Sequence, residues 1–232
     1  MYIHGKVPRS VVNGPGTRAV IWVQGCQNMG GPGKGCNQCW NPETHQHGIG
    51  PEEELVDLAR WVIRLKGIDG ISFSGGEPMQ QATDLYVLMR LIRVGRPDLS
   101  IGMFTGYTKR ELEAGEFQWY EGSRARDGYG FIWSDICSNL DFAVMGRYNQ
   151  RLHTNSKPLC GSSNQTVELF SDRYRLNDFA QQSTEIIISP DGQLVNITGF
   201  PASHEKLKAG LKEASCVDRT TSSPFVSPRR EN

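Results

Sequence analysis

The distribution of apolar residues predicts strands and helices in alternation over the first 145 residues. Short apolar runs rich in β-branched residues predict strands at 18–24, 70–73, 99–105 and 140–145. Apolar residues at helical spacing predict helices at 51–66, 79–94 and 109–116. This alternation is typical of a parallel sheet whose functional loops follow the carboxyl ends of the strands. We therefore expect an α/β fold.

Three segments between and before these elements have a less regular pattern. Residues 1–17 are turn-rich, and Asn13-Gly14-Pro15-Gly16 predicts a tight bend. Residues 117–138 mix Gly, Arg and aromatic residues and give no assignment. Residues 149–165 are predicted to form an ordered loop that is too polar to be a core element.

The C-terminal part of the chain combines a hairpin signal with a polar tail. Runs at 185–189 and 193–198 flank a Pro-Asp-Gly turn, which predicts a β-hairpin. From about residue 215 onward Ser, Thr, Pro and Arg dominate, which favours disorder. We expect one domain over 1–214, with its core at about 11–200, and a disordered tail at 215–232.

Composition excludes several classes of function. The chain has 25 basic and 25 acidic residues, so its net charge gives no reason to expect nucleic acid or an anionic membrane as a partner. No apolar run approaches the roughly 18–20 residues of a membrane span, and the N-terminal residues lack the apolar core of a signal peptide. We expect a soluble, cytoplasmic protein, in which cysteines are ligands or buried thiols rather than disulfides.

Three of the six cysteines lie in one glycine-rich loop that follows the first predicted strand. Cys26, Cys36 and Cys39 are soft ligands of the kind that zinc and iron–sulfur clusters prefer. His45 or His47 would complete a structural Cys3His zinc site. Without a fourth ligand, the three thiolates would instead hold a cluster with one iron open to substrate. The isolated Cys137, Cys160 and Cys216 are interpreted as structural residues.

A second motif at the end of the next strand favours the cluster. Gly75 and Gly76 expose their backbone to a ligand, and Glu77 brings a carboxylate that could hold an ammonium group. In a parallel sheet this motif lies at the same edge as the cysteine loop. Gly-Gly-Glu-Pro alone is a weak signal, but its combination with three cysteines one β–α unit earlier is specific.

These motifs resemble the radical S-adenosylmethionine (SAM) enzymes of the activating-enzyme branch, above all the activating proteins of anaerobic ribonucleotide reductase. The resemblance covers about residues 11–175. It rests on seven blocks: NGPGTR at 13–18, QGC at 24–26, CWNPET at 39–44, SGGEP at 74–78, TGYT at 105–108, GRY at 146–148 and GSSNQ at 161–165.

The chain departs from the family pattern at several points. The cysteine spacing is C-x9-C-x2-C instead of the usual CxxxCxxC, an insertion that loop-closure entropy tolerates. Asn13 replaces the usual Asp, and Gln38 stands where the family carries an aromatic or apolar residue against the adenine. The C-terminal hairpin and tail also extend beyond the compact activases. We expect the insertion to affect the choice of partner and substrate more than the cofactor.

The resemblance implies a partial (β/α) barrel with its cofactors at the carboxyl ends of the strands. It also implies that Cys26, Cys36 and Cys39 bind three irons of a [4Fe–4S] cluster, whose fourth iron is chelated by the amino and carboxylate groups of SAM. The implied cofactor-binding residues are Gly75, Gly76, Glu77, Thr105 and Trp40. Arg147, Asn164 and Gln165, in later blocks, are candidates for contact with cofactor or partner.

The implied reaction is reductive cleavage of SAM to methionine and a 5′-deoxyadenosyl radical that takes a hydrogen atom from substrate. In an activase this hydrogen comes from a glycine of a separate glycyl-radical enzyme, and the electron comes from a donor such as flavodoxin or ferredoxin. Two alternatives stay open. One is the same chemistry on a peptide or small molecule, which the insertion and hairpin favour somewhat. The other is a non-catalytic zinc-binding module.

Overall fold

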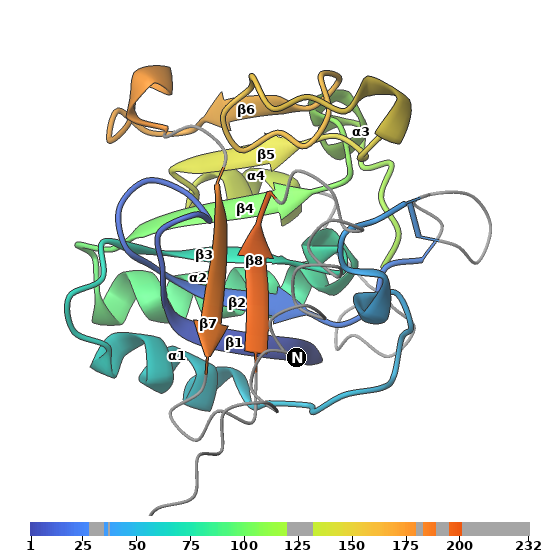
Figure 1. Cartoon of the computed structure of the whole chain (residues 1–232). Coiled ribbons are helices and arrows are strands. Elements are labelled where there is room, and N and C mark those ends of the chain that lie inside the picture. Colours follow the sequence, from blue (N-terminus) through green and yellow to red (C-terminus); the bar gives the residue numbers. More distant parts are fainter. Residues whose placement is uncertain (28–34, 37, 120–131, 180–182, 189–194, 201–232) are drawn as a thin grey trace, which may run out of the picture. The chain divides into compact units, whose positions relative to one another are not determined.

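Six strands form a central sheet in the computed structural model (Figure 1). They are β1 (Ile3–Ser10), β2 (Arg18–Val23), β3 (Gly70–Gly75), β4 (Ser100–Thr105), β5 (Phe142–Met145) and β6 (Thr166–Leu169). They lie in sequence order, with β2 to β5 parallel and β1 and β6 antiparallel at the edges. The predicted α/β class is confirmed. The structure describes residues 1–27, 35–36, 38–119, 132–179, 183–188 and 195–200.

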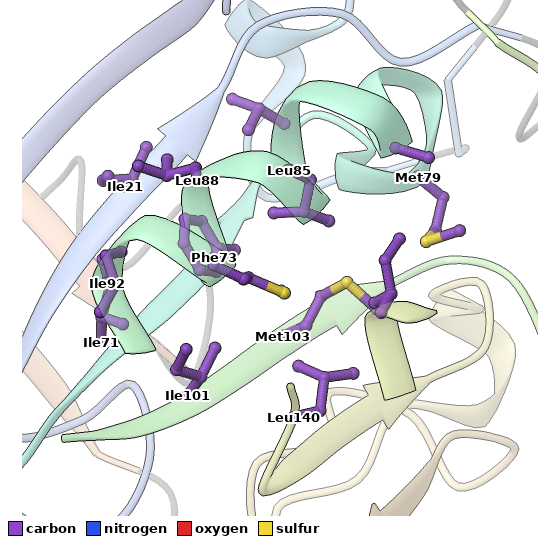
Figure 2. Packing of buried hydrophobic residues seen from close by; sticks show 14 of the residues in the cluster. Ile21, Ile71, Phe73, Met79, Leu85, Leu88, Ile92, Ile101, Met103 and Leu140 are labelled. Atoms are coloured by element: carbon purple, nitrogen blue, oxygen red, sulfur yellow. The ribbon is translucent and has the colours of Figure 1, made fainter. Parts of the chain in front are cut away.

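Helices form the larger of two apolar clusters with one face of this sheet. The helices are α1 (Leu55–Arg64), α2 (Ala82–Gly95), α3 (Lys109–Glu113) and α4 (Ile132–Cys137). α2 packs against both α1 and α4. Figure 2 labels part of the shared core: Ile21, Ile71, Phe73, Met79, Leu85, Leu88, Ile92, Ile101, Met103 and Leu140. Burying one such side chain contributes about 1.5–3 kcal/mol.

A smaller apolar cluster lies on the opposite face of the sheet. Phe142 and Val144 of β5 belong to it, because successive side chains of a strand point to opposite faces. Leu159 and Cys160 are buried in the same cluster. The loop at 149–165 therefore contributes to the core, although its composition predicts that it is too polar to do so.

The predicted C-terminal hairpin is confirmed as β7 (Thr184–Ile188) paired antiparallel with β8 (Val195–Gly199). It contacts the loop before β2: the Asn13 side-chain amide donates to the Thr198 hydroxyl at 2.9 Å. The predicted turn and the tail at 215–232 lie outside the described residues. Within the part of the chain that the structure describes, no helix is long and apolar enough to span a membrane.

The apolar pattern misses three elements: β1, β6 and α4. β1 lies in the segment predicted as turns, because Gly5, Lys6 and Pro8 interrupt its apolar positions. β6 has only four residues, all at least partly exposed, so it carries no buried run. α4 falls in the unassigned segment 117–138, of which 120–131 lie outside the described residues.

The predicted boundaries of three helices are wrong, among them the end of α3, which lies at Glu113 rather than at about residue 116. α1 begins at Leu55 rather than Pro51, because the preceding residues pair with the N-terminal strand: Ile3 N–H donates to Pro51 O at 3.1 Å. The helix is followed by Leu65, whose extended backbone ends it before Gly67. α2 begins at Ala82, after a 3₁₀ turn at Pro78–Gln81.

Candidate functional site

The carboxyl ends of the four parallel strands bring the predicted motifs to one edge of the sheet. β2 leads into the cysteine loop, β3 into Gly76 and Glu77, β4 into Gly106, and β5 into Gly146 and Arg147. The last residues of β2 and β3 lie in register, as do those of β4 and β5. The parallel arrangement therefore assembles four separate loops into one candidate site.

The Gly-Gly-Glu loop is attached directly to the cysteine loop through the backbone. Gly76 N–H donates to Val23 O, and Glu77 N–H donates to Gly25 O, both at 2.8 Å. A methyl group at Gly76 would collide with the carbonyl of Gly25, so only glycine permits this approach. Gly75 has φ +97°, a conformation that also favours glycine. The two glycines thus hold the cysteine loop close to Glu77.

Glu77 is buried and connects three strand ends. Its Oε1 accepts hydrogen bonds from Met79 N–H at 2.9 Å and from the Thr105 hydroxyl at 2.8 Å. Its Oε2 accepts one from Gly106 N–H at 2.7 Å. Burial raises the pKa of Glu77 to about 7, although these three donors oppose the shift. A carboxylate has about four acceptor positions, so one further donor, such as an ammonium group, can be accommodated.

The three cysteines share one neighbourhood. Cys26 N–H donates to His45 O at 3.0 Å, and Cys39 N–H donates to Cys36 O at 3.2 Å. Burial, the Glu77 carboxylate and the other two thiols raise the pKa of Cys26. Burial also raises the pKa of Cys39 to about 11, with a contribution from Cys36. Within the described residues, no three His, Cys, Asp or Glu groups converge closely enough to form a metal site by themselves.

These thiols fit an iron–sulfur cluster in their chemistry. Burial makes each thiolate unfavourable unless a cation compensates its charge, and iron supplies that compensation when it displaces the protons. Burial raises the pKa of Cys36, although the charge of Arg147 and a hydrogen bond from the backbone of Tyr148 favour its thiolate. The glycine-rich segment at 28–34 lies outside the described residues.

Arg147 is a cation that faces this site. Its Nη1 donates to both carboxylate oxygens of Glu111 at 2.9 Å, and its guanidinium lies 5.4 Å from the centre of the Tyr107 ring. Its charge favours the thiolates of Cys26 and Cys36 and the carboxylate of Glu77. Although burial opposes it, hydrogen bonding to Arg147 and Thr108 lowers the pKa of Glu111 to about 2.

The other candidates fall into two groups. Trp40, next to Cys39, forms an aromatic group with Tyr148 and His153, with ring centres 6.2–6.3 Å apart. Asn164 and Gln165 brace the loop after β5, since their side-chain amides donate to the carbonyls of Arg147 and Gly146 at 2.8 Å. The two amides therefore hold the backbone of the loop that carries Arg147.

Sequence reasoning misses three polar residues of the site. Glu111 is the partner of Arg147, and the capping box that it forms with Thr108 was readable as a Thr-x-x-Glu pattern. Gln80 and Gln81 are buried in the turn after Glu77. Their signal in the sequence is that two adjacent polar residues stand at the start of a helical pattern that is otherwise apolar.

Comparison with known proteins agrees with this arrangement. A family model described as "4Fe-4S single cluster domain" matches residues 12–168. The anaerobic ribonucleoside-triphosphate reductase-activating protein of Escherichia coli K12 is 31% identical over 176 residues, covering 72% of this chain and 97% of the relative. The chain belongs to this family of radical SAM activating enzymes.

Two further relatives support the membership. The anaerobic ribonucleoside-triphosphate reductase-activating protein of Vibrio cholerae is 29% identical over 180 residues, covering 74% of this chain and 99% of the relative. The pyruvate formate-lyase-activating enzyme of Clostridium pasteurianum is 32% identical over 96 residues, which is 39% of this chain and 38% of that protein.

Family membership confirms the predicted resemblance and cofactors. The protein is a radical SAM enzyme whose cofactors are a [4Fe–4S] cluster and SAM. This decides between the two metal interpretations, in favour of an iron–sulfur enzyme over a zinc-binding module. The matched region includes all the motifs at the sheet edge and ends before the β7–β8 hairpin.

Proposed function

We propose that this protein activates a partner glycyl-radical enzyme. Support comes from the relatives, which carry the names of activating proteins for anaerobic ribonucleoside-triphosphate reductase and pyruvate formate-lyase. The structural observation that supports the cofactor chemistry behind this role is the meeting of the cysteine loop with Glu77 at one sheet edge, through the hydrogen bond from Glu77 N–H to Gly25 O. We also propose that the sheet is the wall of a partial (β/α) barrel.

In this proposal Cys26, Cys36 and Cys39 bind three irons of the cluster. When bound, the cluster supplies an electron that cleaves SAM to methionine and a 5′-deoxyadenosyl radical, which removes a hydrogen atom from a glycine of the partner. The protein holds the thiolates in a buried setting, and the charge of Arg147 compensates that of Cys26 and Cys36. Flavodoxin or ferredoxin is the proposed class of electron donor.

The amino acid end of SAM is assigned to the Glu77 side of the site. The ammonium group takes the remaining acceptor position of the carboxylate, which Thr105 and Gly106 orient. Gly75 and Gly76 leave room for the ligand beside the cysteine loop, and Trp40 is proposed to line the same pocket. Because the ammonium is a cation, its arrival favours the carboxylate form of Glu77 over the acid form.

The test of the cofactor assignment is anaerobic reconstitution with iron and sulfide, followed by electron paramagnetic resonance (EPR) of the reduced protein with and without SAM. We expect a cluster signal that SAM perturbs and that is lost in Cys36→Ala. Cys160→Ala is the matched control, because this buried thiol lies in the apolar cluster on the opposite face. A Cys36→Ala protein that keeps a SAM-sensitive cluster would contradict the assignment.

The activase role needs a separate experiment. The reconstituted protein, SAM and a reductant are mixed with the glycyl-radical enzyme of the same organism, and the product is examined for a glycine-centred radical by EPR. A radical that depends on all three components supports the role. Production of 5′-deoxyadenosine and methionine without a radical on the partner would contradict it.

One observation favours the second candidate, a peptide or small-molecule substrate. The β7–β8 hairpin lies beyond the family-matched region, and its Thr198 is bonded to Asn13 in the motif where the family carries Asp. An added element at this motif is a place where substrate choice can change. The same reaction without partner enzyme, run with deuterated peptides and analysed for deuterium transfer into 5′-deoxyadenosine, distinguishes this candidate.

A further inference from the structure

Gln80 makes a two-point contact with the backbone next to Cys26. Its side-chain carbonyl Oε1 accepts from Gln27 N–H at 2.9 Å, and its Nε2 donates to Gln27 O at 2.7 Å. The side chain is buried and lies three residues after Glu77, and Gln80 N–H donates to Glu77 O at 3.0 Å. One residue therefore connects the Glu77 turn to the chain just after the first cysteine.

The neighbouring glutamine, Gln81, holds the backbone two residues before Cys26. Gln81 Nε2 donates to Gln24 O at 3.0 Å and to Tyr2 O at 2.9 Å. Between these two contacts, Cys26 N–H is bonded to His45 O at 3.0 Å. The turn Pro78–Gln81 thus fixes the backbone on both sides of Cys26.

This arrangement matters because of the long spacing between the first two cysteines. A segment of nine residues separates Cys26 from Cys36, so the ends of this loop place little restraint on each other. Contacts with residues outside the loop must therefore set the direction in which the chain leaves Cys26. Gln80 satisfies both polar groups of Gln27 in a buried site, where an unmade hydrogen bond is costly.

We propose that Gln80 is a positioning residue that sets the orientation of the Cys26 thiolate on the cluster and couples it to the Glu77 turn. The inference rests on the proposed assignment of Cys26 as a ligand. A leucine at position 80 has similar volume but neither hydrogen bond. The Cys26 loop then shifts relative to Glu77, so the cluster binds but holds SAM in altered geometry.

The experiment compares Gln80→Leu with Thr83→Val after anaerobic reconstitution. Thr83 is the matched control, because its hydroxyl has no hydrogen-bond partner among the described residues and it lies one turn further along the same segment. We expect Gln80→Leu to retain iron, to show shifted g values, and to bind SAM about tenfold more weakly, because both hydrogen bonds that position the Cys26 loop relative to Glu77 are lost. Thr83→Val should match the wild type.

Other outcomes separate the possible failures. A wild-type EPR spectrum and SAM affinity in Gln80→Leu would overturn the inference. If Gln80→Leu does not fold, Gln80→Glu is measured instead, since it keeps the acceptor for Gln27 N–H, loses the donor and should still shift the g values. A SAM-sensitive cluster that survives in Cys26→Ala would instead refute the ligand assignment on which the inference rests.

Discussion

Each end of the parallel strands buries an ionisable side chain, and the protein satisfies the hydrogen-bonding groups of the two side chains to different degrees. Arg18, at the amino end of β2, is fully buried and donates to Ser72 Oγ, Pro15 O, Ile71 O and the hydroxyl and carbonyl oxygens of Ser100. Burial lowers the pKa of Arg18 to about 10, which still leaves it charged. Its hydrogen-bonding capacity is taken up by the protein itself.

Glu77, at the opposite end, keeps an acceptor position of its carboxylate that no donor among the described residues fills. It is as deeply buried as Arg18, but its three donors leave room for another, and burial raises its pKa to about 7. At the amino end of the sheet, the protein itself thus satisfies the buried charge of Arg18. At the carboxyl end, Glu77 can still accept a hydrogen bond from a cationic group. A site that binds a cationic ligand differs from a structural core in this respect, although both are buried.

The largest expected effect follows removal of the closed network. Arg18→Met removes the guanidinium donor from buried oxygens on β3, β4 and the loop before β2, and we expect the free energy of unfolding to fall by about 3 kcal/mol or more. Urea denaturation of the reduced apoprotein measures this. Arg9→Met is the control, since the exposed Arg9 guanidinium bonds surface carbonyls at Lys66 and Gly67 and should change stability by less than about 0.5 kcal/mol. Equal stability of the two variants would refute the comparison.

The second effect is a pH dependence that comes from Glu77. Its folded pKa of about 7 lies above the ordinary value of 4.5, so its contribution is present below about pH 4.5 and is lost as pH rises through 7. The loss is on the order of 3 kcal/mol. Subtracting the denaturation profile of Glu77→Gln from that of wild type isolates it from Glu111, whose lowered pKa acts in more acidic solution. A difference that is flat between pH 4.5 and 8 would contradict this assignment.

The third effect is on the approach of the two loops. Gly76→Ala forces the Glu77 turn away from Gly25, at a cost of about 1–3 kcal/mol, because backbone atoms cannot move aside cheaply. We expect a cluster whose EPR signal no longer responds to SAM. Gly5→Ala, which adds a methyl group in open space on β1, should leave the response intact. A normal response in Gly76→Ala would show that the contact with Gly25 is dispensable.

The smallest effect concerns the hairpin. Thr198→Val keeps the shape of the side chain but loses the hydrogen bond to Asn13, and we expect about 1 kcal/mol lower stability with an unchanged cluster signal. Thr184→Val, at an exposed position of β7, is the control in the same denaturation experiment. A changed SAM response in Thr198→Val alone would connect the amino end of the sheet to the site and weaken the contrast between the two ends.

Sequence predicted the central strands and the location of the motifs, because continuous apolar runs and strand-end loops are local features. It did not predict β1 or β6, whose pairing with the sheet depends on neighbours distant in the chain. The predicted positions of Cys26 and Glu77 at one edge agree with the structure. The hydrogen bonds from Thr105 to Glu77 and from Gln80 to Gln27 join residues that are 28 and 53 positions apart, and no local pattern specifies them.

The bond between Asn13 and Thr198 also has a consequence for biosynthesis. It joins residues 185 positions apart, across almost the entire described chain. A ribosome must therefore have translated the hairpin before the first loop of the protein can reach its final state, whereas the sheet needs only the residues up to Leu169. The order of synthesis therefore places the bond between Asn13 and Thr198 after every residue of the six-stranded sheet has been made.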